Sequence, residues 1–192
     1  MAIQHERWIS PEDYLEIDRA IPDVKYEYID GHMYAMSGGT IDHARIAMNL
    51  IRALDDHLQG RSCRVFSSDV RVQVAEKKYF YTDVTVCCNS EDWQQGNFDI
   101  IRFPRLVIEV LSPSTEARDR RIKSPSYQAC LSIQEYALIS TQYQMVEVFR
   151  RYVNGNMWLY YQYGIDQVVE LASAELTLPL SHIYRFTSVS ET

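Results

Sequence analysis

A carboxylate interrupts a stretch of sequence that is otherwise apolar on both faces of the strand it predicts. The run 106–111, Leu-Val-Ile-Glu-Val-Leu, is apolar everywhere except at Glu109, and such a run is typical of a strand that other layers cover on both sides. An uncompensated carboxylate there would cost several kcal/mol or would take up a proton. A second acid, Asp83, lies in the strongly β-forming run 79–86. Two acids embedded in strand-forming sequence therefore indicate a cation site.

The length and composition predict one soluble globular domain that spans residues 1–192. The chain has 192 residues, of which 46% are apolar and 23% are charged. This is enough apolar material for a hydrophobic core that needs no disulfide or metal ion to hold it together. Within it we expect a helix and a hairpin over about 10–36, a core over about 40–140 and further strands over about 143–185. The formal charge of −7 argues against a surface coated with basic residues for tight, non-specific nucleic-acid binding.

The four cysteines, Cys63, Cys87, Cys88 and Cys130, form no Cys-x-x-Cys pair. Because such a pattern is typical of thiols in a reducing compartment, we expect all four to be reduced core residues of a cytosolic protein. The sequence contains no apolar run of about 18 residues and no signal-peptide pattern. We therefore expect a cytoplasmic location and no membrane partner.

Local signals give an order of elements. Ser10 and Pro11 start a short helix, and Asp30-Gly31 predicts a two-residue hairpin turn between strands at 26–29 and 32–36. An apolar stripe at helical spacing predicts a helix over 41–58. A further helix is expected over 116–132, and strands are expected at 64–74, 79–88, 106–111, 136–139, 146–151, 157–163, 168–171 and 176–180. A helix on each side of the strand group predicts an α/β layered domain with a mixed sheet.

Asp83, Glu109 and Lys123 form the constellation with the clearest chemistry. Two acids on neighbouring strands can hold one Mg²⁺, for which Mn²⁺ is the usual substitute, because that ion takes a few hard oxygen ligands and keeps several waters. Such an ion stabilises charge on a phosphate and lowers the pKa of a bound water. A nearby lysine can orient the water or offset the phosphate charge. This combination suits phosphodiester hydrolysis, with Asp83 and Glu109 as metal ligands and all three residues as the catalytic group.

The same residues carry a family resemblance that covers roughly residues 10–185. The segments Tyr81-Thr82-Asp83 and Glu109-Val110-Leu111-Ser112-Pro113-Ser114-Thr115, followed by Asp119 and Lys123, resemble the PD-(D/E)xK nuclease superfamily. More narrowly, the chain is similar to the Uma-type branch of restriction-endonuclease-like proteins. That similarity extends to Tyr26-Glu27-Tyr28-Ile29-Asp30-Gly31, Met36-Ser37-Gly38 and His43.

The resemblance implies a restriction-endonuclease-like αβββαβ core, preceded by the N-terminal helix and hairpin and followed by a strand-rich C-terminal extension. Asp83 would correspond to the PD aspartate and Glu109 to the acid of the (D/E)xK element. Leu111 stands where that element has its lysine, and in this branch a lysine on the following helix, here Lys123, is thought to serve instead. Thr82 replaces the proline of the PD pair. Pro125 removes a helical hydrogen bond and disfavours helical geometry at Ser124, which could instead cap a second helix.

Each candidate also has a simpler reading. Glu109 could be neutralised by a structural hydrogen bond or by a buried arginine, Arg71 or Arg121, and Lys123 could be a solvated helix residue. Secondary site candidates have plain alternatives too: Asp69 could be a turn residue, Glu27 a cross-strand partner and His43 a packed histidine. The dense basic cluster is either a solvated helix start or a rim that binds nucleic-acid phosphates; it comprises Arg118, Arg120 and Arg121 together with Lys123.

Two functions follow from these readings. The first is a metal-dependent endonuclease-like hydrolase that acts on DNA. The second is a binding or assembly module that keeps the nuclease fold and cuts nothing, as the acidic charge, Thr82 and Pro125 suggest. A homodimer is expected in either case, because the aromatic C-terminal segment supplies an apolar face; its tyrosines are Tyr160, Tyr161 and Tyr163.

Overall fold

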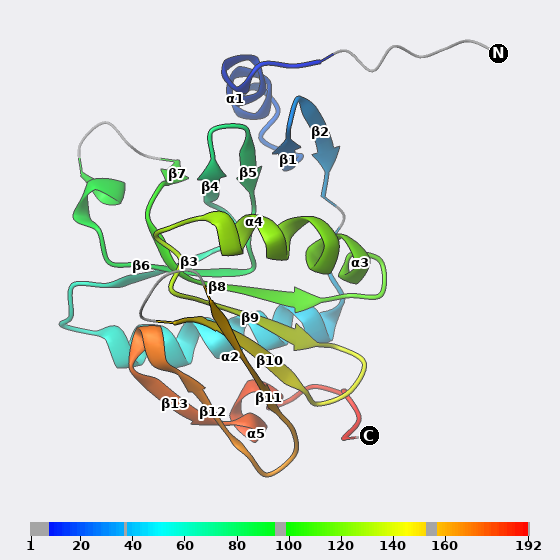
Figure 1. Ribbon diagram of the computed structural model, residues 1–192. Coiled ribbons are helices and arrows are strands. Elements are labelled where there is room, and N and C mark those ends of the chain that lie inside the picture. Colours follow the sequence, from blue (N-terminus) through cyan, green and yellow to red (C-terminus); the bar gives the residue numbers. More distant parts are fainter. Residues whose placement is uncertain (1–7, 37, 95–98, 153–156, 192) are drawn as a thin grey trace.

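The computed structural model describes residues 8–36, 38–94, 99–152 and 157–191. Within these ranges the chain forms a six-stranded mixed sheet, a five-stranded mixed sheet and a small two-stranded ribbon (Figure 1). The six-stranded sheet has the order β11 (Trp158–Tyr163), β10 (Val146–Arg151), β9 (Glu135–Ser140), β8 (Pro104–Leu111), β6 (Val84–Cys87), β3 (Arg64–Ser67). The five-stranded sheet has the order β2 (His32–Ala35), β1 (Tyr26–Ile29), β5 (Lys78–Phe80), β4 (Arg71–Ala75), β7 (Ile100–Ile101).

Helices cover both faces of the six-stranded sheet. Helix α2 (Ile41–Leu58) packs on one face, and a helical segment made of α3 (Glu116–Arg118), η2 (Asp119–Lys123) and α4 (Ser124–Ala129) packs on the other (Figure 1). Strand β8 alternates between these layers, because successive side chains of a strand point to opposite faces. Its residues Leu106, Ile108 and Val110 join the core around α2, whereas Val107 and Leu111 join the core around α4. Glu109 therefore points toward the α4 side.

The two predicted N-terminal helices are present, and the first has the expected cap at Ser10. Helix α2 has the predicted bounds, and the Thr40 hydroxyl accepts a hydrogen bond from the backbone N–H of His43 at 3.2 Å. Helix α1 (Pro11–Ala20) begins after Ser10, whose hydroxyl accepts from the N–H of Asp13 at 3.1 Å. The hairpin of β1 and β2 turns at Asp30-Gly31 as predicted. Ser37, part of the resemblance, lies outside the described residues.

Two predicted single strands are each broken in the structure. The run 64–74 divides into β3 and β4, and the run 79–88 divides into β5 and β6. In both cases the first and second halves belong to different sheets. The breaks fall at Asp69 and Asp83, so neither acid lies inside a strand as the β-forming sequence had suggested.

The helical segment passes through Pro125 without ending, which corrects the expectation for Ser124. Residues 119–123 form a π-helical turn, in which the N–H of Ser124 bonds to the carbonyl of Asp119, and the Ser124 hydroxyl donates to the same carbonyl at 3.0 Å. Ser124 keeps helical angles, φ −54° and ψ −48°. Pro125 has no N–H and so interrupts the helical hydrogen bonds, and the wider turn accommodates this interruption within the helix. The helix then ends at Ala129 rather than at residue 132.

The prediction of four reduced cysteines is wrong, because the structure joins Cys63 to Cys88 in a disulfide. Strands β3 and β6 pair with Arg64 opposite Cys87. The next residue on each side of this pair is a cysteine, so Cys63 and Cys88 lie opposite each other. Cys87 and Cys130 are free thiols. Separately, none of the helices in the described ranges has the length and apolar character needed to cross a membrane.

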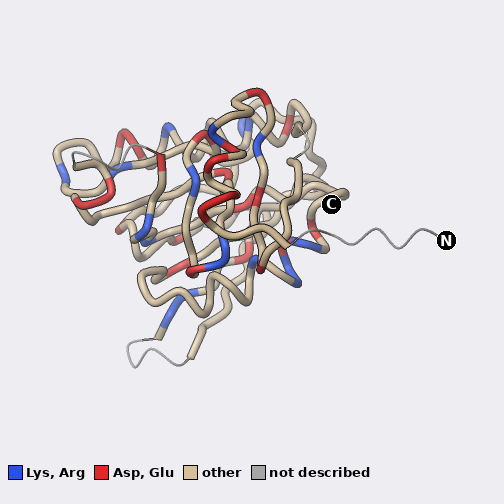
Figure 2. The backbone as a smooth tube through the Cα atoms, turned by 90° about the horizontal axis from the view of Figure 1, so that it is seen from above, with Lys and Arg blue, Asp and Glu red and all other residues tan. Residues whose placement is uncertain are grey.

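The C-terminal segment completes the core on the α2 side. The ribbon of β12 (Val168–Leu171) and β13 (Leu176–Pro179) packs there with the short helix α5 (Leu180–Ile183), which the sequence did not predict. The remaining helical turns are η1 (Ser90–Trp93) and η3 (Ala172–Ala174). Figure 2 shows Lys and Arg positions interspersed with Asp and Glu positions along the described backbone.

Candidate active site

A cavity of about 400 Å³ lies where the two sheets and α2 meet. Four of the residues singled out in the sequence line it: His43, Asp83, Glu109 and Lys123. They come from α2, the β5–β6 connection, β8 and η2, which are distant in sequence. The structure thus brings the proposed catalytic group together at one place.

Glu109 is held by two groups that reach it from the helical segment. Its Oε1 accepts a hydrogen bond from the Tyr127 hydroxyl and lies 3.1 Å from Nζ of Lys123. Burial raises the pKa of Glu109 well above its ordinary value; the charge of Lys123 opposes this shift, and the nearby Asp119 and Asp83 add to it. Among the described residues no arginine neutralises Glu109, but the alternative of a structural hydrogen bond is present, since Tyr127 donates one.

Asp83 is fixed by the backbone of the neighbouring strand. Its Oδ2 accepts a hydrogen bond from the N–H of Val110 at 2.7 Å, and Nε2 of His43 lies 3.3 Å from the same oxygen. The hydrogen bond to Asp83 raises the pKa of His43, although burial of the ring opposes the shift. The break between β5 and β6 is what lets Asp83 reach the backbone of β8.

Lys123 lies among three carboxylates. Its Nζ is 2.8 Å from Oε1 of Glu27, 3.1 Å from Oε1 of Glu109 and 3.2 Å from Oδ1 of Asp119. Burial alone would lower the pKa of Lys123, but the charges of these carboxylates outweigh it and raise the pKa. Lys123 therefore stays protonated and can act as a hydrogen-bond donor and a positive charge, not as a base.

The two other acids proposed for the site occupy different positions. Glu27, on β1, is 2% exposed and bridges Lys123 to Arg118, whose Nη2 lies 3.1 Å away. It stands behind the cavity as a partner of Lys123. Asp69, in the exposed turn between β3 and β4, pairs with Lys25 at 2.6 Å and does not line the cavity.

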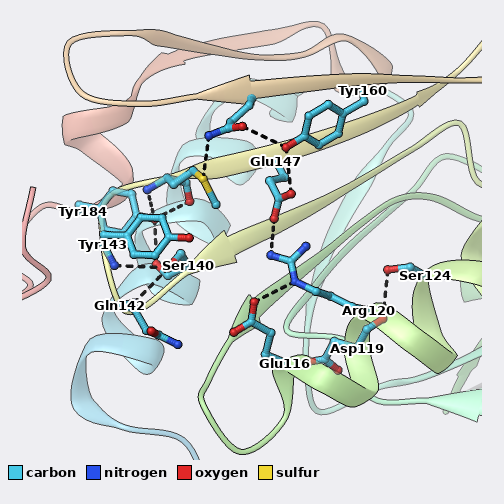
Figure 3. Close-up of polar contacts among 12 residues, drawn as sticks. Glu116, Asp119, Arg120, Ser124, Ser140, Gln142, Tyr143, Glu147, Tyr160 and Tyr184 are labelled. Atoms are coloured by element: carbon cyan, nitrogen blue, oxygen red, sulfur yellow. Dashed lines mark hydrogen bonds and ion pairs between the residues drawn. The ribbon is translucent and has the colours of Figure 1, made fainter. Parts of the chain in front are cut away.

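The three arginines of the basic cluster expected as a phosphate-binding rim have different surroundings. Arg118 packs over the ring of Tyr34, 4.3 Å from its centroid. Arg120 turns to the far side of the helix, where its guanidinium bonds to Glu116 and Glu147 (Figure 3). Arg121 is exposed.

The donor set is compatible with a divalent cation. The described contacts of Asp83 use Oδ2 and those of Glu109 use Oε1, so each carboxylate keeps one oxygen for a further ligand. Mg²⁺ needs only one or two carboxylates because it retains several waters. Within the described ranges, no three His, Cys, Asp or Glu side chains are grouped so that they alone could enclose an ion. Asp83 and Glu109 are therefore the pair that would hold Mg²⁺.

Sequence reasoning missed Tyr127 and gave Asp119 no role. Both are almost fully buried and belong to the group around Lys123, Asp119 as an ion-pair partner and Tyr127 through Glu109. A signal was present, since Asp119, Lys123 and Tyr127 are spaced four residues apart and so share one face of a helix. Gly39 was missed as well: a Cβ there would lie 2.7 Å from Nδ1 of His43.

Comparisons with known proteins identify the family of the chain. Residues 11–183 match the model of the Uma2 family, described as "Putative restriction endonuclease". Two proteins of Synechocystis sp. are similar to the chain. The uncharacterized protein slr1290 is 36% identical over 178 residues (92% of each chain), and the uncharacterized protein sll1609 is 29% identical over 160 residues (83% of this chain and 89% of the relative).

The fold also matches a solved structure. A crystal structure described as a "putative nuclease belonging to DUF820" from Anabaena variabilis superposes with a TM-score of 0.71 at 21% identity, over 92% of this chain and 97% of the other. This match confirms the nuclease-like α/β fold that the sequence predicted. Because the family model spans almost the whole described chain, the protein belongs to the Uma2 family of restriction-endonuclease-like proteins.

Proposed function

We propose that this protein is a metal-dependent endonuclease that hydrolyses DNA phosphodiester bonds. The observation that carries the proposal is the pairing of Asp83 and Glu109 in one cavity with a protonated lysine, Lys123, 3.1 Å from Glu109. Membership of a restriction-endonuclease-like family supports it. Mg²⁺ bound by the two carboxylates would supply charge stabilisation at a phosphate and a more acidic water.

The chain's own residues hold the two carboxylates in fixed positions. The N–H of Val110 and the ring of His43 fix Asp83, while Tyr127 and Lys123 fix Glu109. Two carboxylates are therefore presented to the cavity in set orientations, which reduces the reorganisation needed when a cation and a phosphate arrive. The Lys123 ammonium places a positive charge beside Glu109, which would offset the charge of a bound phosphate, because the surrounding carboxylates raise its pKa.

Plasmid cleavage in Mg²⁺ or Mn²⁺ tests the proposal. Asp83→Asn keeps the size of the side chain and an oxygen for the Val110 N–H but removes a charge, so we expect at least about a hundredfold loss of cleavage. Asp55→Asn is the matched control, because Asp55 is exposed on α2 and lies outside the cavity. Equal cleavage by wild type and Asp83→Asn would exclude this site.

A second function has one observation in its favour. Lys123 already places a positive charge among three carboxylates, which would let the fold stand without a metal as a DNA-binding or assembly module. The melting temperature in Mn²⁺ separates the two functions. A hundredfold excess over the dissociation constant stabilises a native site by about 2.7 kcal/mol. An unchanged melting temperature would favour the non-catalytic function.

A further inference from the structure

A second cavity adjoins the candidate active site and has a different charge balance. Its volume is about 350 Å³, and its charged lining consists of Arg19, Lys25 and Arg71 against Asp18 and Asp69. The first cavity is instead lined by four acids, Asp23, Asp83, Glu109 and Asp119, and by two lysines, Lys25 and Lys123. The first cavity thus has an excess of acids, whereas the cations of the second cavity are balanced by acids. Arg19 and Arg71 pair with Asp18 and Asp99, and Lys25 pairs with Asp69.

Lys25 stands on the wall that the two cavities share. It lines both of them, together with Val24 from the same connection between α1 and β1. A nucleic-acid strand whose reacting phosphate occupies the first cavity has to leave it past one of the walls. Over the wall at Val24 and Lys25, its next phosphate would enter the second cavity beside the ammonium of Lys25.

The ammonium of Lys25 is held in a way that permits exchange. Its ion-pair partner Asp69 is 2.6 Å away, and the two side chains are 37% and 78% exposed. Exposed pairs of this kind contribute little to stability because water and salt screen them. A phosphate can therefore replace the carboxylate of Asp69 at small cost.

The other basic residues near the first cavity are committed elsewhere. Lys123 has three carboxylate partners, Arg118 lies between Glu27 and the ring of Tyr34, and Arg120 lies between Glu116 and Glu147. Arg71 is 7% exposed and bonds to Asp18, Tyr81 and Asp99. Among the cavity-lining cations in the described part of the chain, Lys25 combines access to both cavities with an exchangeable partner.

We propose that Lys25 is the centre of a second phosphate subsite, which binds the DNA backbone phosphate next to the one held in the first cavity. The proposal rests on the proposed function for its choice of DNA as ligand. It makes Asp69 a competitor of the DNA phosphate for the same ammonium. Removing the lysine and removing the aspartate should therefore change DNA affinity in opposite directions.

The test measures binding of the full chain to a fluorescein-labelled 20-base-pair DNA duplex by anisotropy. Ca²⁺ replaces Mg²⁺ to keep the duplex intact. Lys25→Ala should weaken binding about fivefold and reduce the slope of log affinity against log salt by about 0.9, the loss of one phosphate contact. Asp69→Asn should tighten binding about twofold, since the lysine no longer has to leave a carboxylate. The double variant should behave as Lys25→Ala does.

A matched ion pair on α2 supplies the control. Arg52 and Asp56 are 3.6 Å apart, both strongly exposed, and line neither cavity, so Arg52→Ala and Asp56→Asn should leave affinity within the error of the wild type. Equal binding by wild type and Lys25→Ala, or weaker binding by Asp69→Asn, would overturn the subsite. Plasmid cleavage by the same preparations distinguishes failure of the subsite from failure of the proposed function. If the wild type cleaves but Lys25→Ala binds DNA as the wild type does, only the subsite is excluded. If Lys25→Ala weakens DNA binding but the wild type does not cleave, only the nuclease activity is excluded.

Discussion

The hydroxyl of Tyr127 donates a hydrogen bond to Oε1 of Glu109 inside the protein, where the tyrosine is 0% and the glutamate 3% exposed. The bond links the helical segment to the strand that carries the acid. It also fixes which oxygen of the carboxylate is engaged, because Lys123 contacts the same Oε1. A residue with no ionisable role near neutral pH therefore sets the orientation of the candidate metal ligand.

We expect Tyr127→Phe to lower cleavage about tenfold and to raise the Mn²⁺ concentration needed for half-maximal rate, because Glu109 loses a fixed orientation. Loss of the buried hydrogen bond should also cost about 1 kcal/mol in the free energy of unfolding. Cleavage against Mn²⁺ concentration and urea unfolding measure the two effects. Tyr136→Phe is the control, since that buried hydroxyl bonds to Gln128 away from the site. A wild-type Mn²⁺ dependence in Tyr127→Phe would show that the tyrosine does not orient Glu109.

Local sequence signals predicted the elements whose causes are local. The apolar stripe predicted both ends of α2 correctly, because the buried residues Ile46, Leu50 and Leu54 act within one helix. The embedded Glu109 identified a strand with both faces covered, and the family pattern connected it with Asp83 and Lys123. These three residues do line one cavity.

Contacts between distant segments decided what the sequence could not show. Asp83 lies in the break between two strands, and its carboxylate bonds to the N–H of Val110, 27 residues away. The partners of Lys25 and Arg120 are likewise set by tertiary structure, because Lys25 pairs with Asp69 and Arg120 pairs with Glu147. Pairing of Cys63 with Cys88 depends on the register of β3 against β6, which cysteine spacing does not encode.

Replacement of Lys123 should destabilise the protein and create a dependence on metal. Lys123→Met leaves three buried carboxylates without their shared cation, which typically costs about 3 kcal/mol or more. A divalent cation can supply the missing charge, so Mn²⁺ should restore part of the loss. Urea unfolding with and without Mn²⁺ measures both effects. The double variant Lys123→Met/Asp119→Asn should be more stable than Lys123→Met alone, because Asp119, which pairs with Lys123, would otherwise remain a buried and unpaired charge; equal stability would contradict the proposed charge balance.

Gly39 and Gly38 form a natural pair for testing the position of His43. A Cβ at Gly39 would approach Nδ1 of His43 to 2.7 Å, whereas a Cβ at Gly38 meets nothing within 4 Å. We therefore expect Gly39→Ala to move the ring away from Asp83 and to lower cleavage by about tenfold or more, since small displacements in a site have large effects on rate. Gly38→Ala should cleave at the wild-type rate. Parallel assays of both variants, with melting temperatures to confirm folding, make the comparison, and equal rates would show that His43 does not support Asp83.

The ion pairs of Asp99 predict a loss of stability in acid. Asp99 accepts hydrogen bonds from Arg19 at 2.7 and 3.2 Å and lies 3.1 Å from Nη2 of Arg71. The bond from Arg19 lowers the pKa of Asp99 below 3.8, burial opposes the shift, and the charge of Arg71 adds to it. A carboxylate with a lowered pKa stabilises the fold at pH values above its unfolded pKa, and that contribution disappears as the pH falls through the folded pKa.

Asp99→Asn should therefore melt below the wild type at pH 7, and the difference should shrink as the pH falls through the lowered pKa of folded Asp99. The difference at pH 7 should correspond to less than about 1 kcal/mol, because Asp99 and Arg19 are partly exposed, and so to a shift of at most about 4 °C in melting temperature for a chain of this size. Thermal melts between pH 2.5 and pH 7 measure this convergence. Asp55→Asn, an exposed change on α2, serves as the control. If the difference in melting temperature between wild type and Asp99→Asn stays constant over the whole pH range, the charge of Asp99 is not what stabilises the contact between α1 and the five-stranded sheet.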